Sequence, residues 1–398
     1  MKTVSRLCLL LGLIQICFSL PGLAQAHAYK YVLLVGTYTA MDGKDTGSKG
    51  IYSYQFDESS GKLGPAGVAA ETVNPSFLVV APNKKFVYAV NELQKYKGEA
   101  SGGVTAFALD RKTGKLKELN EVASRGADPC YISFDRTGKY LLVANYTGGT
   151  VAVFPVSSDG HIAEASSVVD DKGTLGPNKE RQEHAHAHWI EASAHNRFAY
   201  VADLGLDRVL IYKFDAAKGV LSSEAAGASD TSFFSATLAP ATGPRHIAIS
   251  KSVDFMYVLG ELDSTVTVFA NDNKETFRSI QKISALPSGF SGKNDAAEIA
   301  IHPSGKFLYT SNRGDDSIAV FEIDRATGKL TFTQRISTEG KAPRHFAIDP
   351  AGTHLLVANQ DSGNVVEFKI DSPTGKLTSE GEVAKVPAPV CLVFVPAD

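Results

Sequence analysis

The sequence predicts an all-β fold, a seven-bladed β-propeller, and two observations lead to it. A unit of roughly fifty residues recurs along the chain, for example as "NPSFLVVAPNKKFVYAVNE" and again as "DPCYISFDRTGKYLLVANYTGGTVAVF". Each unit holds short runs rich in Val, Ile, Phe and Tyr between Gly, Asn, Asp and Pro turns, which predicts antiparallel strands joined by hairpins. Four strands in a repeat of this length are typical of a propeller blade.

The register of the repeats follows from the residue that opens each unit. It is Pro or Ala in every unit: Pro75, Pro129, Ala187, Pro244, Ala296, Pro343 and Pro389. The last unit, "APVCLVFVPAD", supplies one strand. The N-terminal runs "YVLLVGTYT", "GIYSYQF" and "GVAAETV" supply the other three. We therefore expect the two ends of the chain to meet in the seventh blade, which closes the ring.

The first residues indicate export. A short basic start, an apolar run over residues 7–20 and a small A-x-A site at residues 24–26 predict a secretory signal peptide over residues 1–26. The apolar run is too short to span a membrane comfortably. We expect a periplasmic or extracellular protein whose mature chain, residues 27–398, is one propeller domain.

The charge balance disfavours two classes of partner. The chain has 40 Lys and Arg against 43 Asp and Glu, and loss of Lys2 and Arg6 with the signal makes it more acidic. A mildly acidic chain without basic runs is not expected to bind nucleic acid, or a membrane after signal cleavage. The sequence leaves the oligomeric state unknown.

The cysteines predict no disulfide. Cys130 and Cys391 are the two that follow residues 1–26. They stand one and two places after the opening proline of blades that are not neighbours, so their side chains are expected to face opposite ways. We predict two free, buried thiols.

Two sets of equivalent positions predict where the site lies. The first strand of a blade lines the central channel, and the position after the opening residue holds Ser76, Cys130, His188, Arg245, Ala297, Arg344 and Val390. The end of the second strand holds Thr37, Glu92, Tyr146, Leu204, Glu261, Arg313 and Gln360. Charges buried there must pair with one another or line a wet channel.

The charged positions gather in adjacent blades and predict an anion site. Arginines bind carboxylate or phosphate and stabilise a developing oxyanion, and a carboxylate or imidazole beside them can take a proton from water. The group consists of His186, His188, Arg245, Glu261 and Arg313. The alternative is that these residues only hydrate the axis or pair neighbouring blades.

The segment "RQEHAHAHWI" places His184, His186 and His188 at alternate positions, which would face one side of a strand. Three ligands so spaced on one strand converge poorly on a tetrahedral ion, and neighbouring arginines would repel a dication. We therefore expect no metal and no cofactor. The polar segment "DKGTLGPNKERQEH" before them is as long as loops that carry function.

The motifs "VGTYT", "GPRHIAI", "GELDSTVTVF" and "SNRGDDSIAVF" resemble the lactonase family of seven-bladed propellers, from about Tyr31 to the C-terminus. That family includes propeller-type 6-phosphogluconolactonases and carboxy-muconate cyclases. The resemblance implies a catalytic set of one histidine, two arginines and a glutamate: His186, Arg245, Glu261 and Arg313. Ala185 stands where the family has proline and Trp189 follows. These departures leave the choice between His186 and His188 open and suggest a reshaped pocket.

The resemblance implies hydrolysis of a lactone. Arg245 and Arg313 would hold the substrate anion or the carbonyl oxygen, while Glu261 or His186 activates water. Three further channel residues are expected to contact the substrate: His188, Arg344 and Glu92. The expected partner is a small anionic lactone or sugar acid. Because a phosphorylated sugar lactone is normally cytosolic, export leaves an unphosphorylated lactone open.

A different class of function is also open. A non-catalytic extracytoplasmic propeller that binds a carbohydrate or a protein would fit the export signal and the altered histidine segment. A redox propeller with a quinone or haem is disfavoured, because the chain has no C-x-x-C-H motif.

Overall fold

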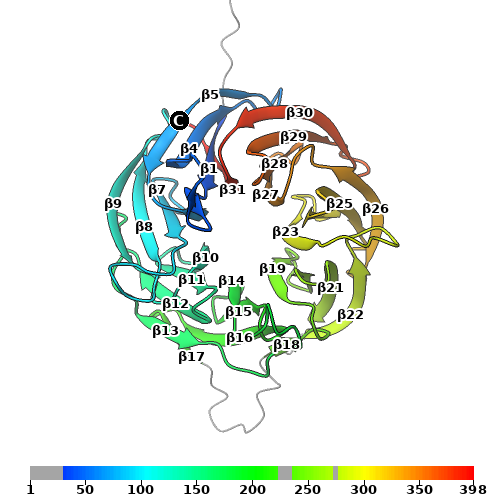
Figure 1. The fold of residues 1–398 in the computed structure, drawn as a ribbon, viewed down its shortest axis with the longest axis horizontal. Coiled ribbons are helices and arrows are strands. Elements are labelled where there is room, and N and C mark those ends of the chain that lie inside the picture. The colour runs from blue at the N-terminus through cyan, green and yellow to red at the C-terminus, as the bar shows by residue number, and fades with distance from the viewer. Residues whose placement is uncertain (1–29, 223–234, 272–276) are drawn as a thin grey trace, which may run out of the picture.

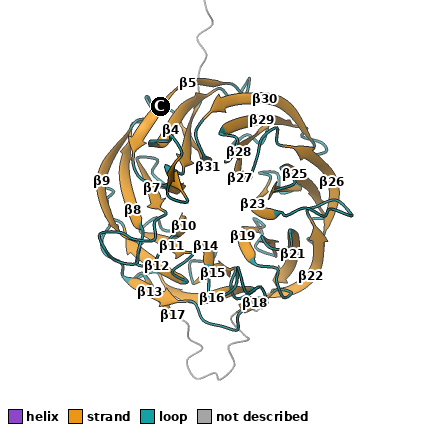
Figure 2. Ribbon diagram, in the orientation of Figure 1, coloured by secondary structure: helices purple, strands orange, loops and turns teal. Residues whose placement is uncertain are grey.

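Seven β-sheets surround one central axis in the computed structural model, which describes residues 30–222, 235–271 and 277–398 (Figure 1). The structure is all-β over these ranges, as Figure 2 shows, and the seven-bladed propeller is confirmed. The expected signal peptide, residues 1–26, lies outside the described residues. In the part of the chain that the structure describes, no helix is long and apolar enough to cross a membrane.

Each blade is an antiparallel sheet of four strands, with β18 as a fifth strand in one of them. The strands follow one another outward from the axis in chain order, except in the closing blade, where the C-terminal strand is innermost. The innermost strands are β6 (Pro75–Val80), β10 (Pro129–Phe134), β14 (Ala187–Ala192), β19 (Pro244–Ile249), β23 (Asp295–Ile301), β27 (Pro343–Ile348) and β31 (Pro389–Pro396). The second strands are β7 (Phe86–Asn91), β11 (Tyr140–Asn145), β15 (Phe198–Asp203), β20 (Phe255–Gly260), β24 (Phe307–Arg313), β28 (His354–Asn359) and β1 (Tyr31–Thr37).

The outer half of each blade completes the sheet. The third strands are β8 (Gly103–Leu109), β12 (Thr150–Pro155), β16 (Arg208–Asp215), β21 (Thr265–Asn271), β25 (Ser317–Ile323), β29 (Asn364–Ile370) and β4 (Gly50–Phe56). The outer strands are β9 (Leu116–Ala123), β13 (Ser167–Asp170), β17 (Val220–Ser222) with β18 (Ser235–Thr237), β22 (Phe277–Ser284), β26 (Leu330–Ser337), β30 (Leu377–Lys385) and β5 (Leu63–Glu71). A small hairpin, β2 (Ala40–Met41) and β3 (Lys44–Asp45), was not predicted from the repeat.

The chain ends meet in one blade, as the repeat predicted. β31 pairs antiparallel with β1, from Tyr31 opposite Pro396 to Thr37 opposite Pro389. This pairing leaves no open edge between the first and last blades, and an open edge would expose unpaired backbone groups. Figure 1 shows the blue and red strands of this blade side by side.

Apolar side chains between the blades form the core. Trp189 is 2% exposed and packs its ring 5.8 Å from that of Tyr131, which belongs to the preceding blade. The side chain of Trp189 thus lies in the core between blades, and a pocket reshaped by Ala185 and Trp189 stays a prediction. Cys130 and Cys391 are buried and free, as predicted.

The innermost strand of every blade carries a β-bulge just after its opening residue. Pairing with the second strand skips one residue in six blades: Ser76, Cys130, His188, Arg245, Arg344 and Val390. In β23 the register jumps from Ala296 to Ile299, so Ala297 and Glu298 both fall within the irregularity. A bulged residue is left out of the ladder and the strand bends there. The channel positions predicted from the repeat are thus the bulged residues.

Candidate active site

Glu261 forms the centre of a cluster of buried charges. It follows β20 at a turn, where its backbone N–H donates to the carbonyl oxygen of Gly243 at 2.8 Å. Its Oε2 lies 2.9 Å from Nε of Arg245 and 3.0 Å from Nη2 of Arg313. Its Oε1 pairs with the guanidinium of Arg181. The structure therefore brings together three of the four predicted catalytic residues and adds an arginine that was not predicted.

Arg181 comes from the long polar loop between β13 and β14. Besides Glu261, its guanidinium contacts Oδ1 of Asp295 and the hydroxyl of Tyr146, both at 3.3 Å. The loop is fixed next to this contact, because buried Gln182 donates from Nε2 to the carbonyl oxygen of Leu204 at 2.8 Å. The length of the loop was the available sequence signal. The repeat register could not single out Arg181, because the loop has no counterpart in the other blades.

The guanidiniums outnumber the carboxylate that they share. Burial alone would raise the pKa of Glu261, but Arg313, Arg245 and Arg181 together lower it to about 2. The pKa of Arg245 is lowered to about 10, first by burial and then by the charges of Arg313 and Arg344. Glu261 is thus ionised at neutral pH, and positive charge remains beyond what it neutralises.

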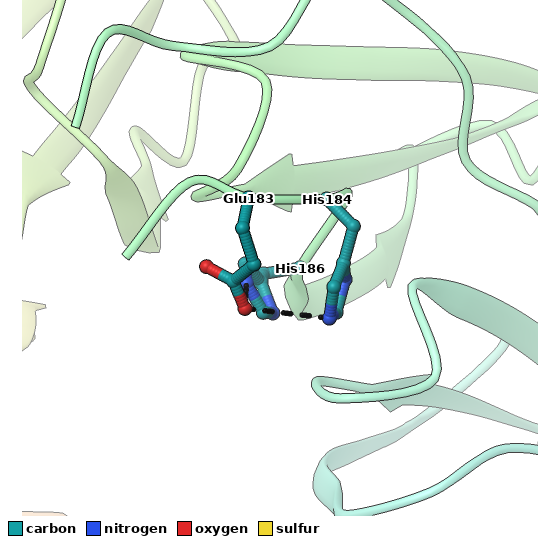
Figure 3. Close-up of side chains that lie close together, drawn as sticks. All are labelled: Glu183, His184 and His186. Atoms are coloured by element: carbon teal, nitrogen blue, oxygen red, sulfur yellow. Dashed lines mark hydrogen bonds and ion pairs between the residues drawn. The ribbon is translucent and has the colours of Figure 1, made fainter. Parts of the chain in front are cut away.

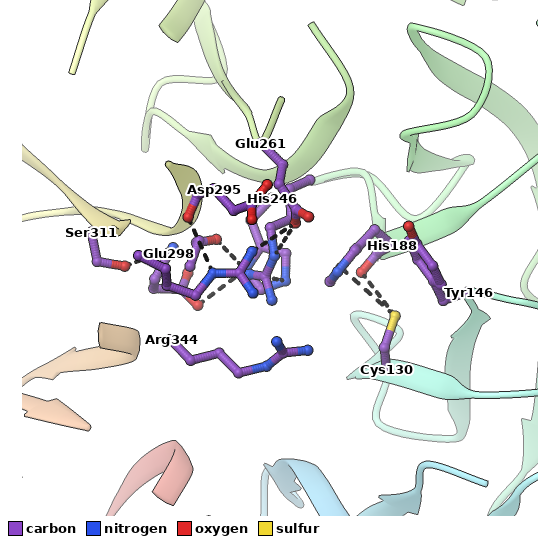
Figure 4. Close-up of polar contacts among 12 residues, drawn as sticks. Cys130, Tyr146, His188, His246, Glu261, Asp295, Glu298, Ser311 and Arg344 are labelled. Atoms are coloured by element: carbon purple, nitrogen blue, oxygen red, sulfur yellow. Dashed lines mark hydrogen bonds and ion pairs between the residues drawn. The ribbon is translucent and has the colours of Figure 1, made fainter. Parts of the chain in front are cut away.

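Arg344 approaches the same channel from the blade of β27. Its Nη2 donates to the hydroxyl of Tyr38 at 2.9 Å, and that hydroxyl donates to Oε1 of Glu92 at 2.8 Å. Figure 4 shows the Arg344 side chain apart from the Glu261 cluster and extended into the channel. A cavity at this point is lined by Arg344, Arg245, Glu92 and Cys130, among others. Two of the three predicted substrate-binding residues, Arg344 and Glu92, therefore share one hydrogen-bond chain.

Glu298 and two histidines were missed by the sequence analysis. Oε2 of Glu298 lies 3.0 Å from Nδ1 of His246 and 3.5 Å from Nε2 of His345. Burial and the charge of Arg245 lower the pKa of His246 well below its usual range. The register pointed to Ala297 in this blade. The irregularity of β23 spans two residues, so Glu298 lies within it as well.

His188 faces the channel as predicted. Its Nδ1 lies 3.7 Å from Sγ of Cys130, and its ring meets that of His246 edge to face, 5.3 Å between centroids. Burial lowers its pKa well below the usual range, and the charges of Arg245, His246 and Arg344 lower it further. The imidazole of His188 is therefore neutral at physiological pH.

The expected one-sided row of three histidines is wrong. β14 begins at Ala187, so His184 and His186 belong to the preceding loop and are not bound to the alternation of a strand. The ring of His186 stacks on Tyr146, with centroids 4.3 Å apart, and lies 4.0 Å from the ring of His184. His186 reaches the arginine cluster through Tyr146, whereas His188 stands on the channel wall.

Comparison with known proteins agrees with this architecture. The family description "Lactonase, 7-bladed beta-propeller" matches residues 32–394. A 6-phosphogluconolactonase of Bacillus subtilis is 36% identical over 318 residues, which cover 80% of this chain and 84% of that protein. One from Formosa agariphila is 35% identical over 320 residues, with 79% and 85% covered. The structure of a periplasmic gluconolactonase of Pseudomonas aeruginosa matches with a TM-score of 0.83 at 34% identity, covering 92% of this chain and 99% of that one. The chain belongs to the lactonase family of seven-bladed β-propellers.

Proposed function

We propose that this protein is a carboxylic-ester hydrolase that opens a sugar lactone with water. The observation that carries the proposal is the cluster of Arg181, Arg245 and Arg313 around the single carboxylate of Glu261, with Arg344 facing the same channel. Ring opening places negative charge first on the carbonyl oxygen and then on the product carboxylate. Buried guanidiniums stabilise both, because their charge is poorly screened away from water.

The arginines are assigned to the oxygen atoms that become negative. Arg245 and Arg313 hold the carbonyl oxygen as water adds to its carbon, and Arg344 holds the product carboxylate from across the channel. The hydrogen-bond chain from Arg344 through Tyr38 to Glu92 supports this assignment, because it fixes the direction of the Arg344 side chain.

Glu261 is assigned a positioning role and not that of the base. A carboxylate with a pKa of about 2 holds a proton poorly, and both of its oxygens are engaged by guanidiniums. Its charge aligns the arginines and offsets part of their repulsion. Of the two proton acceptors expected from the sequence, Glu261 is therefore the weaker candidate.

His188 is assigned as the group that takes the proton from water. Its imidazole is neutral and shares the channel wall with Arg245 and Arg344. Nε2 of His186, by contrast, is turned to the carboxylate of Glu183 at 3.1 Å. The water's oxygen forms the new bond to the carbonyl carbon, the ring C–O bond breaks, and the proton held by His188 passes to the departing ring oxygen. The carboxylic acid so formed releases its remaining proton to solvent.

We further propose that the substrate is an unphosphorylated aldonic lactone. The signal peptide expected at residues 1–26 would carry the protein away from phosphorylated metabolites of the cytosol. The similarity to a periplasmic gluconolactonase supports the same choice.

The test is ring opening followed in a pH-stat, with δ-gluconolactone and 6-phosphogluconolactone offered side by side against spontaneous hydrolysis. We expect a rate above background, higher for the unphosphorylated lactone. Arg245→Met should abolish most of it, and Arg325→Met, at an exposed position in the turn between β25 and β26, should not. A rate no higher than background on either lactone, or an active Arg245→Met variant, contradicts the proposal.

A further inference from the structure

A second cluster of polar side chains lies in the loop before β14, next to the arginine cluster but not part of it. It consists of Glu183, His184 and His186 (Figure 3). Oε1 of Glu183 is 3.1 Å from Nε2 of His186 and 3.4 Å from Nε2 of His184. One ligand atom from each of the three residues lies within 4.8 Å of the other two. The two imidazoles thus converge on one carboxylate oxygen.

The backbone determines which nitrogen of each ring carries hydrogen. Nδ1 of His186 lies 3.1 Å from the carbonyl oxygen of Tyr146, and Nδ1 of His184 lies 2.7 Å from that of Ala185. A carbonyl oxygen only accepts hydrogen bonds, so both Nδ1 atoms must be the donors. In the neutral rings, the Nε2 atoms then present lone pairs.

The lone pairs of the two Nε2 atoms face the Glu183 carboxylate, and this arrangement is stable only with a positive charge between them. A carboxylate also offers only lone pairs, so three acceptors face one another and repel. Either extra protons on the imidazoles or a cation removes this repulsion. Nδ1–H bonded to a backbone carbonyl is also the arrangement that orients histidines whose Nε2 binds a metal.

The distances fit a tetrahedral ion. With bonds of about 2.0–2.2 Å from zinc to nitrogen and oxygen, neighbouring ligand atoms of a tetrahedron lie about 3.4 Å apart. The two measured separations, 3.1 and 3.4 Å, are close to this value. Three protein ligands leave a fourth position for water, as in zinc sites of two histidines and one glutamate.

The surroundings also permit a cation. The nearby arginine, Arg181, has Glu261 and Asp295 as partners. Among the described residues, the ion pairs of Glu183 are with the two histidines. The side chain of His186 is 4% exposed, whereas those of His184 and Glu183 are 45% and 48% exposed. The site thus has one fixed ligand and two that solution can reach. The expectation of no metal rested on strand geometry, which His184 and His186 do not have, and on repulsion by neighbouring arginines, of which Arg181 is paired with two carboxylates.

We propose that Glu183, His184 and His186 bind one divalent transition-metal ion of the zinc class, with its open position toward solvent. The ion ties together three residues at the end of the loop that precedes β14. It lies beside the arginine cluster at Glu261, since His186 stacks on Tyr146, whose hydroxyl contacts Arg181. This site goes beyond the proposed lactone hydrolysis, in which no ion takes part.

The test is a zinc titration of the tag-free protein after treatment with a chelator, with a chromophoric chelator as competitor. We expect one Zn²⁺ per chain, and a loss of affinity of at least about tenfold in His184→Ala and in Glu183→Gln. The matched control is His161→Ala, which removes an exposed histidine 3.2 Å from a single carboxylate, Asp159. It should leave the affinity unchanged.

Two further measurements test the same metal site. Zn²⁺ should raise the melting temperature of the wild type and not that of His184→Ala, because an ion that binds only the folded state stabilises it. Co²⁺ in place of Zn²⁺ should give the visible absorption of a tetrahedral site. A wild type without stoichiometric Zn²⁺ binding, or a His184→Ala variant of wild-type affinity, overturns the proposal. The titration uses no lactone, so it stands or fails separately from the proposed activity.

Discussion

Nε of Arg245 and Oε2 of Glu261 lie 2.9 Å apart in a pair whose side chains are only 3% and 5% exposed. Removing one partner of a buried pair leaves the other charge uncompensated. Here Arg245 and Arg313 would lose their carboxylate partner, and Arg181 would keep only Asp295.

Glu261→Gln should therefore lower the free energy of unfolding by about 3–5 kcal/mol. It should also reduce kcat/KM, because the arginines lose the charge that aligns them. Denaturant unfolding and lactone kinetics measure the two effects. Glu322→Gln, at an exposed position of β25, is the control. Equal stability of the two variants would show that the pair contributes nothing.

The same carboxylate should make stability depend on acid. Its pKa is lowered in the folded protein, from 4.5 to about 2. A lowered carboxyl pKa stabilises the folded state above the unfolded-state value, and this stabilisation is lost as the pH falls through the folded-state value. We expect stability to fall between about pH 4.5 and pH 2, less steeply in Glu261→Gln. Unfolding curves of both proteins over this range test it, and parallel curves would contradict it.

Arg181→Met should affect activity more than stability. The side chain is 35% exposed and projects from a loop, so its loss should cost little folding free energy. It removes one of the three guanidiniums at Glu261, and we expect kcat/KM to fall by about 10²-fold, at the lower end of the effect of losing a stabilising donor. Kinetics and thermal melting are compared with those of Arg325→Met. A variant with normal kinetics would place Arg181 outside the working site.

His188→Asn should lower kcat by about 10²- to 10⁴-fold if His188 takes the proton from water. Because its pKa lies well below 6.5, it remains unprotonated from pH 6 to 8, and the wild-type rate should be flat over that range. The rate should fall only when the pH drops below the usual range of histidine. His186→Asn should lower kcat less. The reverse order of the two variants would assign the proton transfer to His186.

Cys130 and Cys391 should be inert in the folded protein. Burial raises the pKa of Cys391 to about 12 and that of Cys130 well above its usual range, and thiolates are the reactive form. A thiol reagent should label neither cysteine in the native mature protein and both after unfolding in guanidinium. Labelling at native conditions would show that one of these strands opens.

The repeat predicted those site residues that occupy equivalent positions in the blades. Arg245, Glu261, Arg313 and Arg344 lie on the channel because each blade repeats the same strand, bulge and turn. Arg181 could not be found this way, because its position depends on tertiary contacts of a loop without a repeat. The register placed the opening residue of this blade at Ala187, where β14 begins, but strand alternation does not extend back to His184 and His186 in the loop before it.

Because of the bulges, the type of residue that faces the channel does not depend on the strand pairing that builds the blades. In each blade the residue that faces the axis is left out of the hydrogen-bonded ladder, so the ladder places little restriction on its side chain. Serine, cysteine, histidine, arginine and valine all occupy this place in the same chain. Substrate preference in such a protein can therefore change by single substitutions at these positions while the strand pairing of every blade is retained.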